Sequence, residues 1–302
     1  MAHPEAQVEH RVEHRVEHRE GRVRTSDGLA LFEQSWAPAE PGAVVVLVHG
    51  YAEHSTRYEP AARRLAHDGH AVQTLDLRGH GRSEGKRCFV RSFAEYLTDV
   101  ETALLVAERR WPDHPVFLMG HSMGGLISAL FVIERAVPLC GLVLSAPSVM
   151  LGRDFSPLKA GLSAVLGRVL PHFPTVRFRS DSLSRDAGVV QAYRDDELVF
   201  HGRAPARTAS EIIRAIRSVQ ERMDSIELPL LVVHGGRDHV TDVEGSRRLY
   251  ASARSNDKSL RVYDGLFHEI MNEPEKALVL GEISTWLGAR TPVSRPGGRR
   301  CR

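Results

Sequence analysis

The sequence predicts an α/β fold in which a mostly parallel sheet carries helices on both faces. Two observations support it: apolar runs of strand length, such as residues 43–48 (AVVVLV), and helical stretches that alternate with them. A strand that is apolar along its whole length is buried on both faces, as parallel strands are. Regular alternation of strands and helices then favours parallel pairing through right-handed crossovers. The length of 302 residues suits one large domain of this kind.

The elements can be justified in order along the chain. Residues 1–20 contain VEHR three times, and a four-residue repeat drifts around a helix without making a durable apolar face. Residues 291–302 are rich in Pro, Gly and Arg. We expect both segments to be disordered tails around one domain at residues 21–290. Within it the patterns predict a hairpin at 21–36, strands at 43–48, 71–75, 116–119, 139–145, 230–234 and 260–263, and helices at 58–68, 93–110 and 123–135.

One segment, at about residues 148–207, breaks the alternation. It has no clear strand pattern, and its apolar residues recur at helical spacing. We expect a cap inserted over the carboxyl edge of the sheet, where open α/β sheets bind their ligands. An exposed apolar face there would contact a lipid surface; packing against the rest of the cap is the alternative. The spaced residues are Leu158, Leu162, Val165, Leu166, Val169 and Leu170.

Charge and composition exclude several classes. A formal net charge of +2 is too small to indicate nucleic-acid binding. No Cys/His cluster has the spacing of a zinc site, so we expect no metal. The amino-terminal segment lacks the apolar core of a secretory signal, and no apolar run is long enough to span a membrane. We expect a cytoplasmic location, with peripheral contact to a membrane left open.

A short motif carries the clearest chemical signal. Residues 120–124 (GHSMG) fit G-x-S-x-G, follow an apolar strand and open a helix. In that context a strained, glycine-rich turn lifts a serine hydroxyl clear of the sheet. Ser122 is therefore the candidate nucleophile.

A serine hydroxyl needs a base to take its proton, and the base needs an acid to orient it. His268 lies in the loop after the last expected strand, and Asp238 follows the apolar run LLVVH at the end of another. In the triads of α/β enzymes with a G-x-S-x-G motif, the serine comes first along the chain, the acid second and the histidine last. Ser122, Asp238 and His268 follow this order. The rival acids are Asp242 and Asp264, and the rival base is His239.

Ester cleavage also needs donors for the oxyanion of the tetrahedral intermediate. One candidate is the backbone N–H of Met123, directly after the serine. The second is the backbone N–H of Tyr51, in the loop after the strand at 43–48. A preorganised donor of this kind contributes about a hundred- to a thousandfold in rate. We expect His49 to be a structural partner of the same loop.

Several motifs extend this pattern along the chain. They are HGYAEHSTRY (49–58), DLRGHGRSEGKR (76–87), GHSMGG (120–125), VLSAP (143–147), HGGRD (234–238) and GLFHEIMNEPE (265–275). Together they resemble the monoacylglycerol lipases, within the lysophospholipase-like and serine aminopeptidase-like branch of the α/β-hydrolases. The resemblance runs from about residue 21 to residue 287. It implies the α/β-hydrolase fold, the same triad and the same two backbone donors.

The motif at residues 49–58 is more specific to this family than the other motifs. It contains a glutamate and an arginine at a fixed spacing, here Glu53 and Arg57. The resemblance implies that these two side chains help to form the polar pocket for the glycerol end of the substrate. A structural ion pair one helical turn apart is a second, compatible interpretation. The sequence departs from the family at Tyr51, where a smaller residue is usual, and at Ala52, where glycine is usual. The tyrosine ring is expected to narrow either the acyl or the alcohol pocket.

The leading functional expectation is hydrolysis of monoacylglycerols to glycerol and fatty acid through an acyl-enzyme intermediate. No cofactor is expected for this chemistry, and the expected partner is a small lipid ester. A lysophospholipase or a broad carboxylesterase with the same triad is the alternative. A receptor that retains the triad but acts by binding belongs to a different class, and measured turnover of a simple ester separates it from the enzymes.

Overall fold

The computed structural model describes residues 16–150, 165–177 and 180–291. Its centre is an eight-stranded sheet with the strand order β1-β2-β4-β3-β5-β6-β7-β8. The first three strands of this order pair antiparallel and the others pair parallel, so the predicted mostly parallel sheet is confirmed. The strands are β1 (Glu17–Arg24), β2 (Ala30–Ala37), β3 (Ala43–Val48), β4 (His70–Leu75), β5 (Val116–His121), β6 (Gly141–Ser145), β7 (Leu230–Gly235) and β8 (Lys258–Tyr263).

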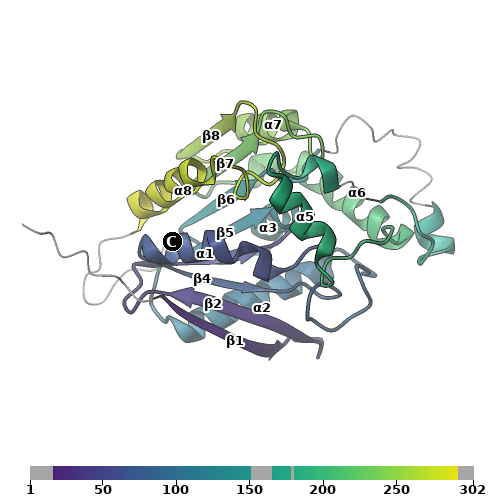
Figure 1. Cartoon of the computed structure of the whole chain (residues 1–302), viewed down its shortest axis with the longest axis horizontal. Coiled ribbons are helices and arrows are strands. Elements are labelled where there is room, and N and C mark those ends of the chain that lie inside the picture. Colours follow the sequence, from purple (N-terminus) through teal and green to yellow (C-terminus); the bar gives the residue numbers. More distant parts are fainter. Residues whose placement is uncertain (1–15, 151–164, 178–179, 292–302) are drawn as a thin grey trace, which may run out of the picture.

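Helices cover both faces of this sheet, as Figure 1 shows. On one face α1 (Glu59–His67) and α8 (Lys276–Arg290) pack against the sheet. The other face carries α2 (Ala94–Arg110), α3 (Met123–Glu134), α6 (Ala206–Glu221) and α7 (Val243–Ser252). None of the helices in the described ranges is long and apolar enough to cross a membrane.

Strand β3 shows why the sheet is buried on both sides. Val44 and Val46 belong to the apolar cluster under α2 and α3, whereas Val45 and Leu47 belong to the cluster under α1 and α8. Successive side chains of a strand point to opposite faces, so a continuous apolar run supplies both cores at once. Because β3 to β8 run parallel, the loops that follow β3, β5, β7 and β8 meet at one edge of the sheet.

The amino-terminal boundary differs from the prediction. Strand β1 begins at Glu17, four residues before the predicted start of the domain at residue 21, so the third VEHR repeat is part of the sheet. The ring of His18 stacks on Trp36 of β2 at a centroid distance of 4.7 Å. A strand needs only a partner strand and a period of two, which the four-residue repeat satisfies. The rest of the predicted tails, residues 1–15 and 292–302, lies outside the described residues.

The predicted cap lies between β6 and β7. Its described part contains α5 (Ala187–Asp195) and a helical turn at residues 165–169, and its only β pairing there is an isolated bridge between Pro174 and Pro205. Of the apolar stripe, Leu158 and Leu162 lie outside the described residues. In the remainder Leu166 is half-buried, and Val165, Val169 and Leu170 are exposed.

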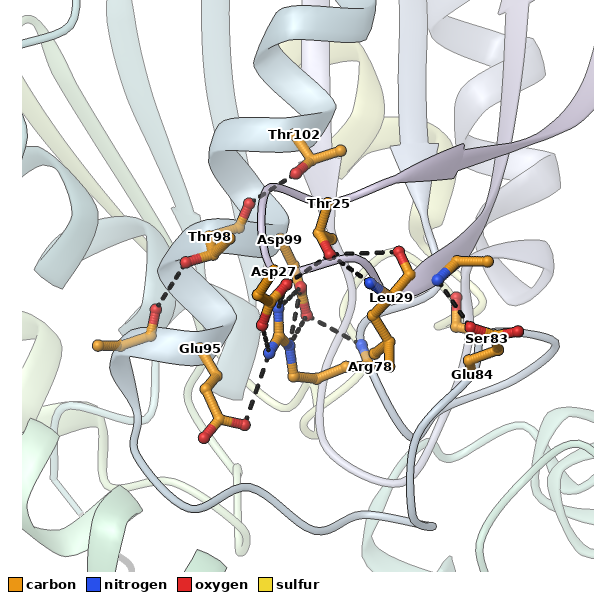
Figure 2. A network of polar contacts seen from close by, with 12 residues as sticks. Thr25, Asp27, Leu29, Arg78, Ser83, Glu84, Glu95, Thr98, Asp99 and Thr102 are labelled. Carbon is orange, nitrogen blue, oxygen red and sulfur yellow. Dashed lines mark hydrogen bonds and ion pairs between the residues drawn. The ribbon is translucent and has the colours of Figure 1, made fainter.

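A buried arginine fastens the β1–β2 turn to the body of the domain (Figure 2). Arg78 follows β4, and its guanidinium donates hydrogen bonds to Asp99 on α2 and to Asp27 in the turn. Glu95 of α2 lies 3.5 Å away. The hydrogen bond from Arg78 holds the pKa of Asp27 below its ordinary value. This cluster joins three segments that are far apart in the sequence.

Candidate active site

Ser122 occupies a strained turn between β5 and α3. Its backbone has φ +54° and ψ −118°, in the positive-φ region that residues with a side chain seldom adopt. The flanking glycines are required by close backbone contacts. A Cβ on Gly120 would lie 2.2 Å from the carbonyl oxygen of Gly124, and a Cβ on Gly124 would lie 2.1 Å from that of Val48. The G-x-S-x-G spacing therefore reflects backbone packing around the serine.

The structure brings Ser122, His268 and Asp238 together at the carboxyl edge of the sheet. His268 Nε2 lies 2.9 Å from Ser122 Oγ, and His268 Nδ1 lies 2.7 Å from Asp238 Oδ2. The three residues come from the ends of β5, β8 and β7. All three side chains are almost fully buried. The serine hydroxyl can therefore donate its proton to the imidazole, whose other nitrogen donates to the carboxylate.

Asp238 is held as a carboxylate by several donors. The N–H groups of Val240 and Thr241 and the hydroxyl of Thr241 donate to it, and His234 Nε2 lies 3.2 Å away. Burial opposes its ionisation, but the attraction of His268 and the hydrogen bonds with His234 and His268 hold the pKa of Asp238 well below its ordinary value. Burial in turn lowers the pKa of His268, but the charge of Asp238 outweighs this and raises it.

Of the three rival residues, Asp242 and His239 make contacts elsewhere. Asp242 caps α7 by accepting a hydrogen bond from the N–H of Glu244. Asp264 lies beside Gly236, where an added Cβ would be 3.2 Å from its Cα. The exposed ring of His239 packs edge-on against Phe267.

The loop after β3 lies directly against Ser122, the candidate nucleophile. A Cβ on Gly50 would be 3.3 Å from Ser122 Cβ and 2.6 Å from Glu53 Oε1, so only glycine fits there. The Gly50 N–H donates to Glu53 Oε1 at 2.7 Å, which holds the loop closed around Tyr51. On the other side Met123 is the first residue of α3, where an N–H has no acceptor within the helix. Met123 thus directly follows Ser122 in the chain, and Tyr51 directly follows Gly50, the residue that lies against Ser122.

His49 has the structural position that we expected. Its Nε2 accepts the N–H of Leu77 at 2.9 Å, so the other nitrogen carries the proton and donates to the carbonyl of Gly50 at 2.7 Å. Burial lowers the pKa of His49 and keeps the ring neutral. The tyrosine that distinguishes this loop turns its ring edge-on to His80, at a centroid distance of 5.8 Å.

Glu53 and Arg57 form the ion pair that the second interpretation predicted, inside a larger buried cluster. Glu53 accepts hydrogen bonds from Arg57 and from the hydroxyl of Tyr58. Arg57 also forms a bidentate pair with Glu269, with both N···O distances 2.8 Å, and lies over the ring of Tyr193 at 4.7 Å. Burial opposes the ionisation of Glu53, but Arg57 and other neighbours lower its pKa to about 2.

Sequence reasoning did not identify several of these neighbours. Glu269 and Tyr58 lie within the sequence motifs quoted above. Their place in those motifs was the signal that could have identified them. Tyr193 comes from the cap, where no pattern marks it. The hydroxyl of Ser148 lies 3.4 Å from that of Ser122. The ring of His121 lies 4.7 Å from that of His268, and burial together with His268 lowers the pKa of His121 to about 4.

Comparisons with known proteins agree with this geometry. The profile of the family described as serine aminopeptidase, S33 matches residues 39–275. The monoacylglycerol lipase of Mycolicibacterium smegmatis is 40% identical over 261 residues, which cover 86% of this chain and 93% of that one. The monoglyceride lipase of Rattus norvegicus is 35% identical over 280 residues, 91% of each chain.

A solved structure shows the same architecture. The crystal structure of Paleococcus ferrophilus monoacylglycerol lipase superposes with a TM-score of 0.78 at 29% identity, and the alignment covers 86% of this chain and 99% of that one. The likeness spans the sheet, the helices and most of the chain. The protein therefore belongs to the serine aminopeptidase S33 family and, within it, to the monoacylglycerol lipase family of carboxylic ester hydrolases, which have the α/β-hydrolase fold.

Proposed function

We propose that this protein hydrolyses monoacylglycerols to glycerol and free fatty acid, with Ser122 as nucleophile, His268 as base and Asp238 as orienting acid. The observation that supports these roles best is the continuous chain of hydrogen bonds from Asp238 through His268 to Ser122. The names of the relatives described above support the substrate class.

Acylation begins when Ser122 Oγ attacks the ester carbonyl and its proton passes to His268 Nε2. The oxyanion of the tetrahedral intermediate accepts hydrogen bonds from the N–H groups of Tyr51 and Met123. His268 then gives the proton to the departing glycerol oxygen as the bond between carbonyl carbon and glycerol breaks. A water molecule, deprotonated by the same imidazole, attacks the acyl-enzyme, and Ser122 leaves with the proton.

The glycerol end of the substrate is assigned to the cluster of Glu53 and Arg57. Glu53 accepts hydrogen bonds from the Gly50 N–H, the Tyr58 hydroxyl and Arg57. A carboxylate offers about four acceptor positions, which leaves one for a substrate hydroxyl. The structural and substrate-binding roles of this pair are therefore compatible. Because every group here is buried, a hydroxyl that binds is shielded from competing water.

The test combines variants with a substrate panel. Ser122→Ala should abolish hydrolysis of a monoacylglycerol and of p-nitrophenyl butyrate with little change in melting temperature. Asp238→Asn should lose about 10⁴-fold in kcat. Asp242→Asn is the matched control and should retain activity. Asp238→Asn that keeps wild-type kcat would contradict the acid assignment.

The panel contains monoacylglycerols of several chain lengths, lysophosphatidylcholine, diacylglycerols and triacylglycerols. The proposal expects the highest kcat/KM on a monoacylglycerol. A higher kcat/KM on lysophosphatidylcholine would identify a lysophospholipase instead.

We also propose that the cap contacts the lipid surface that holds the substrate. Five of the large apolar side chains exposed in the described ranges lie within residues 165–176 of the cap; Val165 is 62% exposed and Val169 is 71% exposed. The lining of a cavity of about 870 Å³ next to them includes four basic residues, Lys86, Arg91, Arg168 and Arg207, besides Asp27 and Glu95, which lie beside Arg78. An exposed apolar patch beside positive charge fits an anionic lipid surface.

Replacing Val165 and Val169 together with serine should weaken binding to phosphatidylglycerol vesicles and slow hydrolysis of dispersed monoacylglycerol, while p-nitrophenyl butyrate is cleaved at the original rate. The matched control replaces Leu105 and Leu278, which are also exposed but lie on α2 and α8. Equal loss of vesicle binding in both double variants would contradict a specific role for the cap.

A further inference from the structure

The cap contacts the loop after β3, residues 49–54, which is called the oxyanion loop here because it contains Tyr51. After α5 the chain passes beside residues 52–54, and it makes two polar contacts there. The N–H of Phe200 donates to the carbonyl oxygen of Ala52 at 2.8 Å. His54 Nε2 lies 2.8 Å from Asp196 Oδ2, and the His54 side chain is almost fully buried.

The loop that receives these contacts has an unfavourable backbone conformation. Ala52 has φ +68°, in the left-handed region that costs energy for any residue with a Cβ. Such a conformation persists only where surrounding contacts hold it. Ala52 directly follows Tyr51, so any relaxation of Ala52 also reorients the peptide groups next to the Tyr51 N–H.

The contacts on this loop come from two sources. The body of the domain supplies one set: the Gly50 N–H donates to Glu53 across the loop, and the Ser55 N–H donates to Asp76 after β4. The cap supplies the other set, since the carbonyl of Ala52 and the ring of His54 are held by the cap contacts described above. Asp196 is itself fixed, since its second oxygen accepts the N–H of Leu198 at 2.9 Å.

We infer that Asp196 is a positioning residue of the cap that orients the oxyanion loop through His54. The inference rests on the proposed function, in which the Tyr51 N–H is an oxyanion donor. The Asp196–His54 bond and the Phe200 amide hold residues 52–54 from the solvent side. The donor then points at the developing oxyanion before substrate arrives. A contact of this kind stabilises the transition state more than the bound substrate, so it acts on kcat rather than on KM.

The principal test is Asp196→Ala, measured on p-nitrophenyl acetate, a small soluble ester that needs no lipid surface. We expect kcat to fall about tenfold to a hundredfold with KM within about twofold, less than the loss of a whole donor causes. Affinity for an alkyl trifluoromethyl ketone, which forms a tetrahedral adduct on the serine, should fall by a similar factor. Asp195→Ala is the matched control, because Asp195 is exposed and accepts hydrogen bonds only from Gln191 among the contacts described.

A second variant guards against simple loss of folding. In Asp196→Asn the side chain keeps its shape but can accept from only one of its two donors, so kcat should fall less than in the alanine variant with an unchanged melting temperature. His54→Phe should lower kcat like Asp196→Ala, and the double variant should be no worse than either single one.

The inference is overturned if Asp196→Ala keeps wild-type kcat and ketone affinity, or if only KM rises. It is also overturned if the effects of Asp196→Ala and His54→Phe add. These results are separable from failure of the proposed function, because that failure appears as retained activity in Ser122→Ala.

Discussion

Two buried arginines in this protein are bound in similar ways but serve different regions. Arg57 lies between Glu53 and Glu269, and all three side chains are almost fully buried. Arg78 lies between the fully buried Asp99 and the half-exposed Asp27. Arg57 joins the loop after β3 to Glu269, the residue next to the proposed base His268, whereas Arg78 joins a hairpin turn to α2 (Figure 2).

The difference teaches that ion-pair chemistry alone does not mark a functional site. Both arginines are paired with more than one carboxylate, so the number of partners does not distinguish them. What differs is where the partners come from: Glu53 and Glu269 follow the carboxyl ends of β3 and β8, next to Ser122, while the partners of Arg78 come from α2 and the β1–β2 turn. We therefore expect changes around Arg78 to affect stability and changes around Arg57 to affect activity.

The largest expected effect is on stability at the Arg78 cluster. Asp99→Ala should lower the free energy of unfolding by about 3 kcal/mol, because it removes the most buried partner of a buried charge. Urea denaturation measures the loss, and kcat/KM should stay near the wild-type value under conditions where the variant is folded. Asp27→Ala, the half-exposed partner, should cost less than about 1 kcal/mol. An Asp99→Ala variant with normal stability and reduced kcat/KM would contradict the assignment of the Arg78 cluster to stability.

The next effect is on substrate choice at the Arg57 cluster. Glu269→Gln should lower kcat/KM for a monoacylglycerol by about tenfold, which corresponds to one charge-assisted hydrogen bond that no longer fixes Arg57. Hydrolysis of p-nitrophenyl acetate, which lacks glycerol hydroxyls, should change by about twofold or less. This variant leaves the Gly50–Glu53 bond intact, so it tests the alcohol pocket without disturbing the oxyanion loop. Equal losses on both substrates would assign Glu269 to the triad or to folding.

The smallest effect concerns pH. In the proposed mechanism His268 acts in its neutral form, so activity should fall as pH drops through its pKa, and the charge of Asp238 raises that pKa above the ordinary 6.5. Glu269 and Glu53 raise it further. The acid limb of the kcat/KM profile should therefore have its midpoint above 6.5 in the wild type and move to lower pH in Glu269→Gln. Asp27→Asn, in the other cluster, should leave the midpoint unchanged.

Much of this fold could be predicted because burial leaves a local signature. The run at residues 43–48 is apolar at every position, and each of those side chains enters one of two cores. The arrangement of the proposed triad could be predicted for a related reason. Ser122, Asp238 and His268 each follow a strand of a parallel sheet, so their order and spacing place them at one edge.

Contacts between distant loops leave no such signature. The Arg57–Glu269 pair joins residues 212 positions apart, and a glutamate beside a histidine has no periodic pattern. The Asp196–His54 contact also leaves no pattern in the sequence, because it depends on how the cap folds back onto the loop. The start of β1 at Glu17 was missed for another reason: the repeat is compatible with a strand, but it forms one only because β2 lies beside it to pair with.

The cap is inserted between two strands that are neighbours in the sheet, since β6 and β7 pair directly. The chain leaves β6 at the carboxyl edge of the sheet, and after the cap α6 returns it to the amino end of the parallel strand β7, so the strand order is independent of what the insertion contains. Evolution, or an engineer, can exchange such a module to change substrate range without redesigning the core. The contacts at residues 52–54 set a condition on that exchange. A transplanted cap must supply an acceptor for His54 and a donor for the Ala52 carbonyl. Compatibility between cap and domain is therefore decided at the few positions where the two make contact.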